Sequence, residues 1–357
     1  MKKIVLTGGG TAGHVTPNIA LLPSLKEAGY DIYYIGSYNG IEKQLMNDYG
    51  IPYTGISTGK FRRYFDLKNF TDPFRVNKGF VEASKFLKKY KPDVVFSKGG
   101  FVSVPVVRAA ALQGIPCIIH ESDMTPGLAN KLCFRVSKKI CCNFPETVKL
   151  LPASKAVLTG TPIRAELFTG DAEKGRRFCG FNNDKPVIMV TGGSLGAEGV
   201  NVAIRETLPK LLEKYNIVHL CGKNKLDKSF SDVEGYKQFE YIKEEMKDLF
   251  AMADVVISRA GANAICEILA LKKPNILIPL PSKSSRGDQL LNARSFEESG
   301  YSAVLEQDKL NPSVLLKTVN KVYEKREKYI ASMASAVQQD SIKAIMDLIE
   351  SASGSDS

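Results

Sequence analysis

The stretch "KKIVLTGGGTAGHVTPN", residues 2–18, decides the fold class of this chain. Its short apolar run predicts a strand over Lys3–Thr7, four glycines follow within six residues, and a helical pattern runs from His14 to Ala28. A strand, a glycine-rich loop and a helix in this order present backbone N–H groups and the positive end of a helix to an anion, most often a phosphate. The stretch therefore predicts an α/β fold with an anion-binding loop after its first strand.

Short β-branched runs alternate with helical patterns over the whole length, which predicts parallel sheets joined by right-handed crossovers. In the first half, we expect strands at Lys3–Thr7, Asp31–Ile35, Asp93–Phe96, Pro116–His120, Lys139–Cys142 and Ala156–Thr159, and helices at His14–Ala28, Lys78–Tyr90, Val104–Gln113 and Gly127–Val136. The second half restarts with "PVIMVTGGSLGAE" and continues with the strands "NIVHLCG", "QFEYI", "DVVIS", "NILIPL" and "SAVL" and with helices at Ala262–Leu271 and Gln289–Ser299.

The two halves begin alike, which predicts two similar doubly wound domains. We expect one domain over residues 1–163 and one over 164–337, with a hinge near Thr159–Arg164 and a C-terminal helix of about 338–357 that packs back on the first domain. Because ligands of such folds bind at the carboxyl ends of the strands, we expect the site between the two domains.

Length and composition indicate a soluble globular protein. The chain has 357 residues, of which 44% are hydrophobic and 24% charged, and no apolar run approaches the length of a bilayer span. The seven cysteines lack CxxC spacing and lie mostly in apolar strands. This pattern favours reduced, buried thiols in a cytoplasmic protein over disulfides or a zinc site.

The net charge of +11 is concentrated between Lys60 and Lys91, where ten basic and three acidic residues leave +7. Eight aromatic residues are interleaved with these charges: Phe61, Tyr64, Phe65, Phe70, Phe74, Phe80, Phe86 and Tyr90. The segment is either a solvated basic helix beside an ordinary core or a surface that lies on anionic lipid headgroups. No recognisable nucleic-acid module is present, so nucleic acid is not an expected partner.

Each glycine loop also fits an enzyme motif that its surroundings do not support. Residues 8–13 fit GxGxxG, but the second strand ends in Gly36–Ser37 without the carboxylate that a dinucleotide ribose needs. Residues 192–196 fit the GxSxG of serine hydrolases, but the one later histidine, His219, lies inside an apolar strand. A second phosphate-binding loop, with the Ser194 hydroxyl as a further donor, explains the latter residues better.

The histidines and carboxylates give further candidates. His14 begins a helix beside the first loop, where the positive helix end favours a neutral imidazole able to accept a proton, although it could merely cap or pack the helix. His120 ends a strand and either acts in the site or braces the loop. Glu267 follows the small residues of "SRAGANAICE" and could accept both hydroxyls of a ribose. The chain has no DxD, so a metal-chelated nucleotide is not favoured.

Several motifs together resemble the MurG family, whose members transfer N-acetylglucosamine from UDP to undecaprenyl-pyrophosphoryl-muramyl-pentapeptide. The family's order is matched over nearly the whole chain by "GGGTAGHVTPN", "KGGFVSVP", "HESDMTPGLANK", "TGTPIR", "GGSLGA", "SRAGANAICE" and "RGDQLLNA". The resemblance implies the GT-B fold, two Rossmann-like domains around a cleft, and no metal or other cofactor.

The resemblance also implies roles for individual residues. His14 matches the family's suggested general base. The expected contacts to UDP-N-acetylglucosamine are Thr11, Ala12, Gly13, Arg164, Ser194, Ile242, Glu267 and Gln289. The expected acceptor-side residues are Gly9, Gly10, His120, Glu121, Asp123 and Asn130. Many relatives have Gln-Asn after "HE", whereas Ser122 and Asp123 stand here.

The implied reaction is a single in-line displacement that inverts the sugar and converts lipid I into lipid II for peptidoglycan synthesis. Loop amides and the helix dipole would stabilise the UDP leaving group. The lipid acceptor places the enzyme peripherally on the cytoplasmic face of the cell membrane, bound through residues 60–91. The alternatives are another GT-B transferase acting on a membrane lipid, a UDP-sugar epimerase and a non-catalytic binding protein.

Overall fold

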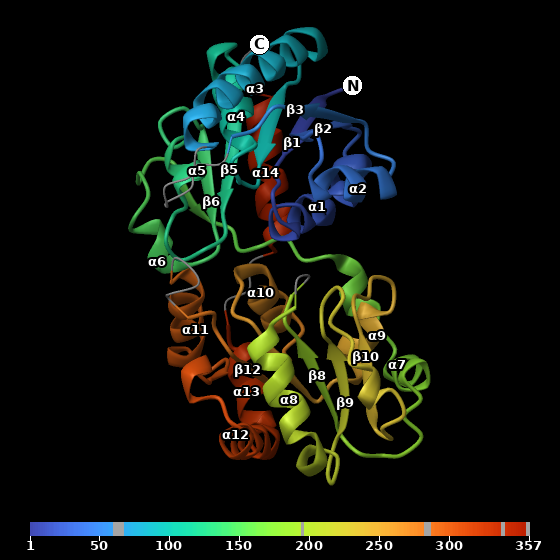
Figure 1. Cartoon of the computed structure of the whole chain (residues 1–357). Helices are drawn as coiled ribbons and strands as arrows, with labels where there is room; N and C mark the ends of the chain where they lie inside the picture. The colour runs from blue at the N-terminus through green and yellow to red at the C-terminus, as the bar shows by residue number, and fades with distance from the viewer. Residues whose placement is uncertain (60–67, 194–195, 282–286, 337–339, 355–357) are drawn as a thin grey trace. The chain divides into compact units, whose positions relative to one another are not determined.

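The computed structural model describes the chain except residues 60–67, 194–195, 282–286, 337–339 and 355–357, and it describes no side chains over 60–73. Contacts divide the chain into two compact units, one of Met1–Arg164 with Gln338–Ser357 and one of Ala165–Val337. Each unit contains one wholly parallel sheet flanked by helices (Figure 1). The predicted α/β class, with two Rossmann-like domains, is therefore confirmed.

The first unit has a seven-stranded sheet in the order β3-β2-β1-β4-β5-β6-β7. The strands are β1 (Lys3–Thr7), β2 (Asp31–Ser37), β3 (Tyr53–Ile56), β4 (Val94–Ser97), β5 (Cys117–Glu121), β6 (Lys139–Cys142) and β7 (Ala156–Leu158). The helices are α1 (Thr16–Glu27), α2 (Ile41–Asp48), α3 (Lys68–Tyr90), α4 (Ser103–Leu112), α5 (Leu128–Lys131), α6 (Pro145–Val148) and α14 (Ser341–Ser353), with a 3-10 turn η1 (Ala12–His14) before α1.

The second unit has a six-stranded sheet in the order β10-β9-β8-β11-β12-β13. Its strands are β8 (Val187–Thr191), β9 (Asn216–Leu220), β10 (Tyr236–Phe239), β11 (Val255–Ser258), β12 (Asn275–Leu277) and β13 (Ala303–Val304). Its helices are α7 (Ala172–Cys179), α8 (Glu198–Leu211), α9 (Met246–Met252), α10 (Ala262–Ala270), α11 (Asp288–Glu298), α12 (Pro312–Glu324) and α13 (Arg326–Ala334), with 3-10 turns η2 (Ala165–Thr169), η3 (Lys228–Phe230) and η5 (Gln307–Lys309).

Several elements differ from the prediction: helix α3 begins at Lys68 rather than at the expected Lys78, and three others differ for local reasons. The helix expected over Gly127–Val136 ends at Lys131, because the N–H groups of Cys133, Phe134 and Val136 bond carbonyls three rather than four residues back. The short edge strand β3 was not predicted, since its glycine interrupts the apolar pattern. Strand β10 begins two residues before the expected "QFEYI", because Tyr236 pairs with Ile217 and is buried.

All seven cysteines are free thiols, and six of them are buried, as the sequence predicts. Burial raises the pKa of Cys117 and Cys141 to about 12, so these thiols are not activated at neutral pH. Among the described residues, no helix has both the length and the apolar character needed to cross a bilayer.

The C-terminal helix α14 completes the core of the first unit. Ile345, Met346 and Ile349 are buried in one cluster with residues of β1 and α1, and Figure 1 shows α14 lying against that sheet. At its end, the hydroxyls of Tyr30 and Ser353 are 2.7 Å apart. Helix α14 thus packs on the first unit through apolar contacts and through this hydrogen bond, although Ser353 lies more than 300 residues after Tyr30 in the chain.

This hydrogen bond gives a direct test of how α14 docks. Tyr30→Phe should lower the free energy of unfolding by about 0.5–1.5 kcal/mol, because the hydrogen bond between the Tyr30 and Ser353 hydroxyls is lost while Ser353 Oγ keeps its bond to Glu350 O. Ser353→Ala should cost a similar amount, and the double variant should cost no more than the larger single change. Urea denaturation of the four proteins measures the coupling, and simple additivity of the two losses would show that the hydroxyls do not interact.

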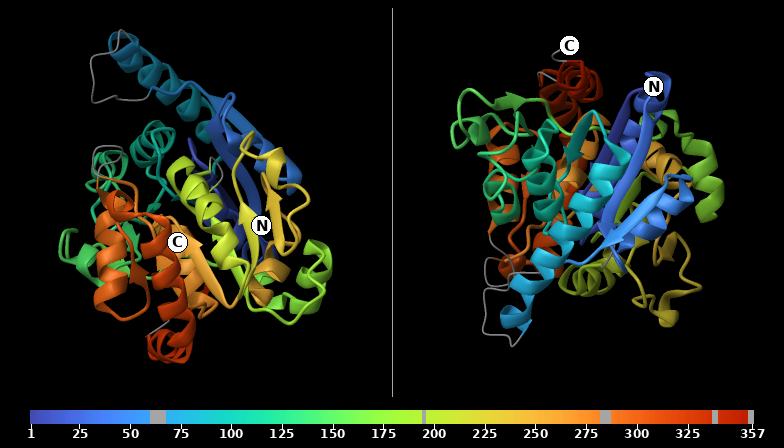
Figure 2. Two further views of the ribbon diagram at one scale, coloured as in Figure 1. Left: turned by 60° about the horizontal axis from the view of Figure 1, so that its bottom comes forward. Right: turned by 90° about the horizontal axis from the view of Figure 1, so that it is seen from above.

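Helix α3 has two different faces. Gly79, Ala83 and Leu87 face the core, and a Cβ on Gly79 would lie 2.0 Å from Ser57 O. The opposite face exposes Phe74 and Val81, and the exposed cations Lys78 and Lys85 alternate with them along the helix. Figure 2 shows the amino-terminal turns of α3 extending past the strands of their own unit (Figure 2).

The structure corrects the expected set of interleaved aromatics. Phe80, Phe86 and Tyr90 pack against the core, and Phe86 lies 4.6 Å from the ring of Tyr33. Phe86 and Tyr90 are four residues apart, and Phe80 is three residues before the buried Ala83, so all three border the buried face of the helix. Phe74 stays exposed, and Phe61, Tyr64, Phe65 and Phe70 lie outside the described side chains.

Candidate functional site

The glycine-rich loop after β1 is held from beneath by buried side chains. Tyr34 Oη donates to Gly8 O at 2.8 Å, and Asn18 Nδ2 donates to Thr7 O at 3.3 Å. A Cβ on Gly8 would lie 2.4 Å from His14 O, so glycine lets the loop fold back on the start of the helix. The sequence Thr7–His14 thus forms a tight, internally supported turn at the carboxyl edge of the sheet.

His14 closes η1 and is partly exposed. Its Nδ1 lies 3.1 Å from Thr11 Oγ1, and its backbone N–H donates to Thr11 O at the same distance. When Nδ1–H donates to the threonine hydroxyl, Nε2 is the basic nitrogen. Thr11 therefore orients the imidazole, and in the tautomer with the proton on Nδ1 the ring can accept a proton through Nε2.

Strand β2 ends in Ser37 without a carboxylate of its own, as the sequence indicates, but a carboxylate from the next helix lies beside its end. Glu42, in the first turn of α2, is fully buried, and its Oε1 accepts hydrogen bonds from Ser37 N at 2.9 Å and Ser37 Oγ at 2.5 Å. Its Oε2 accepts from Gly10 N at 3.3 Å. Glu42 comes from the following helix rather than from the strand, and its burial keeps it from taking ribose hydroxyls.

The predicted residues His120, Glu121 and Asn130 are buried beside β5. Glu121 Oε2 accepts from Asn130 Nδ2 at 2.9 Å and from Gly127 N at 2.8 Å, and its Oε1 accepts from Asp123 N at 3.1 Å. Glu121 and Asn130 therefore shape the loop after β5. Asp123 is the partly exposed member of this predicted set.

His120 is a neutral, buried imidazole. Burial and the charge of Lys98 hold its pKa well below the ordinary value, against a smaller opposite effect of Gly160 O. Nε2 donates to Gly160 O at 2.8 Å, and Nδ1 accepts from Lys98 Nζ at 2.9 Å. Lys98 also contacts Ser122 Oγ. The sequence left two roles open for His120, action in the site or support of the loop. These hydrogen bonds fit support of the loop.

Sequence analysis missed Lys98, although it stands in the quoted "KGGFVSVP". This side chain is 1% exposed at the end of β4, and its Cβ lies within 3.3 Å of where a Cβ on Gly8 would be. A lysine in such a sequence is ordinarily exposed, so the sequence does not predict its burial. Only the tertiary structure shows that Lys98 lies between the loop after β1 and the loop after β5.

In the second unit, the loop from Thr191 to Ala197 follows β8. Ser194 lies outside the described residues. Gly196 has φ of +67°, and a Cβ there would lie 1.9 Å from Cys221 O, so glycine permits the loop to pack against the end of β9. The predicted phosphate-binding loop therefore sits at the carboxyl edge of this sheet, before α8.

His219 lies beneath this loop as a core residue, as the sequence predicts. It is fully buried, with Nδ1 2.8 Å from Tyr236 Oη and Nε2 3.0 Å from Asn201 Oδ1. Burial, with a smaller contribution from Arg205, lowers its pKa to about 3. Asn201 Nδ2 in turn donates to Cys221 O at 2.9 Å, so this neutral network supports the strand end that contacts Gly196.

Three further predicted donor contacts, Glu267, Gln289 and Ile242, lie in the second unit. Glu267 is partly exposed on α10, whose buried side carries Ala262 and Ile265. Gln289 Oε1 accepts from Leu280 N at 3.0 Å, which ties α11 to the segment after β12. Ile242 is buried after β10. Arg164 is the last residue of the first unit's main segment.

Arg259 is a further residue that sequence analysis missed. It is buried after β11, where Nη1 donates to Ile278 O at 2.9 Å and Nη2 donates to Gln307 Oε1 at 2.6 Å. Burial lowers its pKa from the ordinary value. Among the described residues, no group of three His, Cys, Asp or Glu side chains could hold a metal ion.

Comparison with known proteins gives a full-length relationship. The glycosyltransferase family 28 N-terminal domain matches residues 4–142, and the family's C-terminal domain matches residues 187–349. A protein of Lachnospira eligens named UDP-N-acetylglucosamine–N-acetylmuramyl-(pentapeptide) pyrophosphoryl-undecaprenol N-acetylglucosamine transferase is 64% identical over 350 residues, which cover 98% of this chain and 99% of that protein. A Clostridium tetani protein of the same name is 58% identical over 98% of both chains.

Solved structures agree with this relationship. The crystal structure of Acinetobacter baumannii MurG is 26% identical, covers 98% of this chain and 99% of its own, and superposes with a TM-score of 0.75. A UDP-N-acetylglucosamine 2-epimerase, 12% identical over 98% of this chain and 95% of its own, has a TM-score of 0.72 and shares the fold alone. The chain belongs to glycosyltransferase family 28 and, within it, to the MurG family of N-acetylglucosamine transferases.

Proposed function

We propose that this chain transfers N-acetylglucosamine from UDP-N-acetylglucosamine to the 4-hydroxyl of the muramyl sugar of lipid I, giving lipid II for peptidoglycan synthesis. The observation that carries the proposal is identity of 64% over 98% of the chain to a relative whose name states this transfer. An inverting, metal-independent hexosyltransferase of this kind acts in cell-wall biogenesis, and hence in cell shape and division.

The reaction is a single displacement. The acceptor's 4-hydroxyl oxygen attacks the anomeric carbon, the bond from that carbon to the UDP oxygen breaks, and UDP leaves with the electron pair. The hydroxyl proton passes to His14 Nε2, while the hydrogen bond between Nδ1 and Thr11 keeps the ring in place. N–H groups of the loop before α8, together with Ser194, stabilise the negative charge that develops on the leaving phosphate.

The binding roles divide between the units. Donor contacts are Ser194 on the phosphates, Glu267 on the ribose, Gln289 on the sugar and backbone near Ile242 on the uracil. From the first unit, Arg164 and the segment Thr11–Gly13 complete the donor site. The acceptor side consists of Gly9, Gly10, His120, Glu121, Asp123 and Asn130, with the three buried members shaping the loop after β5.

Transfer of labelled sugar tests this function. The protein, UDP-N-acetylglucosamine labelled in the sugar, and a short-chain lipid I analogue should give label in a lipid-extractable product. A UDP-sugar epimerase, which the fold alone would permit, would leave the label on UDP and need no acceptor. Transfer to other membrane lipids in preference to the muramyl acceptor would favour the alternative lipid glycosyltransferase.

The exposed face of α3 supports a peripheral position on the cytoplasmic face of the membrane. Phe74 is 77% exposed and Lys78 67% exposed, and Arg75 and Lys85 are also exposed on the same helix. Apolar side chains between cations suit an interface in which the aromatic ring enters the headgroup region and the charges meet anionic lipids.

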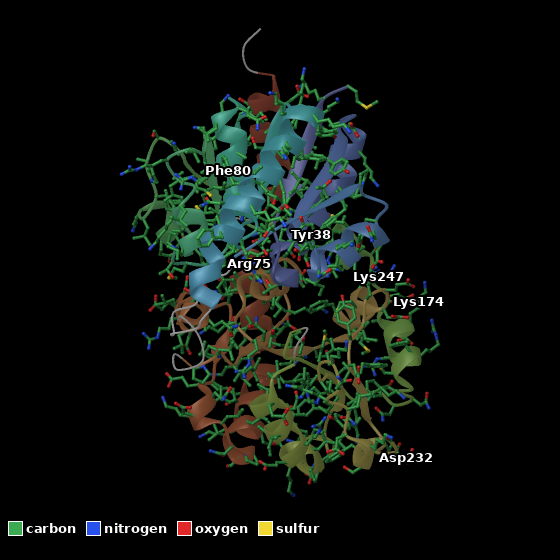
Figure 3. All side chains as sticks on the ribbon, turned by 45° about the horizontal axis from the view of Figure 1, so that its top comes forward. Tyr38, Arg75, Phe80, Lys174, Asp232 and Lys247 are labelled. Atoms are coloured by element: carbon green, nitrogen blue, oxygen red, sulfur yellow. The ribbon has the colours of Figure 1, made fainter. Side chains whose placement is uncertain are left out.

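Replacing Arg75, Lys78 and Lys85 with Gln should weaken binding to anionic vesicles by up to about 100-fold, because each cation near the surface contributes roughly 1 kcal/mol at low salt. The matched control removes three exposed cations, Lys174, Lys210 and Lys237, from the second unit; Figure 3 labels Arg75 and Lys174 (Figure 3). Sedimentation with vesicles measures both triple variants. If both triple variants lose the same affinity for vesicles, α3 contributes only its part of the protein's net positive charge and is not a specific membrane-binding surface.

A further inference from the structure

We infer that Glu42 is a positioning residue for transfer, because it holds the glycine loop that carries Thr11 and His14. It also accepts the hydrogen bond of the Gly10 N–H, which the sequence analysis expected to bind an anion. The inference rests on the proposed function for the role of His14. Glu42 itself contacts neither the donor nor the acceptor in this account, because its side chain is fully buried.

The carboxylate is bound by three donors from two segments. Ser37 contributes its N–H and its hydroxyl to Oε1, and Gly10 contributes its N–H to Oε2. A set composed of donors suits an ionised carboxylate, which accepts at both oxygens. Hydrogen bonds to charged groups are stronger than those between neutral groups, so Glu42 couples the loop after β1 firmly to the end of β2.

The backbone around this carboxylate is built to admit it. A Cβ on Gly9, Gly36 or Gly40 would come within 2.2–2.7 Å of Glu42 side-chain atoms. These glycines come from the loop, from β2 and from the residue before α2. Glycines from three chain segments therefore surround one acidic group. A residue with a side chain at any of these positions would collide with the carboxylate or force it to move.

This arrangement changes the expected role of the first glycine loop. In a phosphate-binding loop, the N–H groups point at the ligand. Here, the Gly10 N–H points at a buried carboxylate, and a phosphate brought to that N–H would meet a like charge. The loop instead serves as a rigid support, since Thr11 follows Gly10 directly and its hydroxyl contacts His14 Nδ1.

Glu42→Gln tests the inference, because glutamine keeps the volume but turns one acceptor into an NH₂ donor facing other donors. We expect kcat with a soluble short-chain acceptor to fall by at least about tenfold, since misplacing a reacting group by about 1 Å can cost 100-fold. The Kd for UDP should change much less than kcat, because the proposed contacts to the phosphates, ribose and uracil, from Ser194, Glu267 and the backbone near Ile242, lie in the other unit. Amide exchange in the peptide covering Gly8–His14 should become faster.

Glu82→Gln is the matched control. Glu82, on α3, likewise accepts from a backbone N–H, that of Ser57, and from a hydroxyl, that of Tyr38, each at 2.7 Å; Figure 3 labels Tyr38. This variant should lower stability without speeding exchange in the loop or lowering kcat. Loop exchange and kcat that are the same in Glu42→Gln as in Glu82→Gln would overturn the inference.

Two further variants keep the outcomes distinct. If Glu42→Gln does not fold, Ser37→Ala removes only the hydroxyl bond to Oε1 and should still lower kcat about threefold and speed loop exchange; unchanged values would refute the inference. His14→Ala, assayed beside them, tests the proposed function alone. Amide exchange in Gly8–His14 reports on the role of Glu42 whichever residue is the general base. Failure of this inference can therefore be distinguished from failure of the proposed function.

Discussion

Replacing His14 with alanine should lower kcat by about 10²–10⁴-fold, the usual contribution of a positioned general base. The acceptor hydroxyl would then have to lose its proton to water as it attacks. Affinity for UDP should change little, because the proposed nucleotide contacts lie on other residues. Single-turnover transfer, with UDP binding measured by calorimetry, separates the chemical step from donor binding.

Thr11 supplies the matched control for this prediction. Thr11→Ser keeps the hydroxyl 3.1 Å from Nδ1 and should retain most of the activity, whereas Thr11→Val keeps the shape and loses the bond that orients the ring. An intermediate loss in Thr11→Val, with little loss in Thr11→Ser, fits a base that acts through Nε2. Turnover of His14→Ala close to that of the parent would require another base.

Chemical modification gives a second measure of the same residue. The chain has three histidines, and His120 and His219 are both fully buried, whereas His14 is partly exposed. Carbethoxylation should therefore modify His14 first and inactivate the protein in step with one modified histidine. A short-chain acceptor should protect it.

Glu267→Ala should raise the KM for UDP-N-acetylglucosamine by roughly 10- to 150-fold, with little effect on the KM for the acceptor. The reason is the loss of a charged acceptor to the ribose hydroxyls, which is worth about 1.5–3 kcal/mol. Glu206→Ala, which removes an exposed glutamate from α8 of the same unit, is the control. Unchanged UDP affinity in calorimetry would remove Glu267 from the donor site.

Much of the fold could be predicted because its determinants are local. A buried parallel strand requires a continuous apolar run, and "KIVLT" and "DVVIS" are such runs in the sequence and are β1 and β11 in the structure. The edge strand β3 was missed because "YTGI" is short and contains Gly55. The early end of α5 goes with backbone bonds from Cys133, Phe134 and Val136 to carbonyls three residues back, which the spacing of apolar residues does not reveal.

The site divides in the same way. The glycine loops and His14 are visible because strand, glycines and helix start are consecutive. Glu42, Lys98 and Arg259 are not visible, since each gains its role from residues brought near by folding: Glu42 contacts a loop 32 residues earlier, and Lys98 contacts a histidine 22 residues later. A charged residue is ordinarily solvated, so its letter alone does not predict burial.

Exposed aromatics were overestimated for a related reason. Composition counts Phe80 and Phe86 with Phe74, but the helical period places the first two toward the sheet and the third toward solvent. Membrane binding through α3 should therefore depend more on its cations than on its aromatic side chains, and vesicle binding should weaken steeply as the salt concentration rises.

The configuration of the new glycosidic bond tests the central claim most directly. A single displacement on the α-linked sugar of UDP-N-acetylglucosamine must give a β-linked product, and proton NMR of the purified product distinguishes the two anomers by their coupling constants. We predict a β-linked N-acetylglucosamine on the 4-oxygen of the muramyl sugar. An α-linked product, or label that never leaves UDP in the presence of the acceptor, would contradict the account.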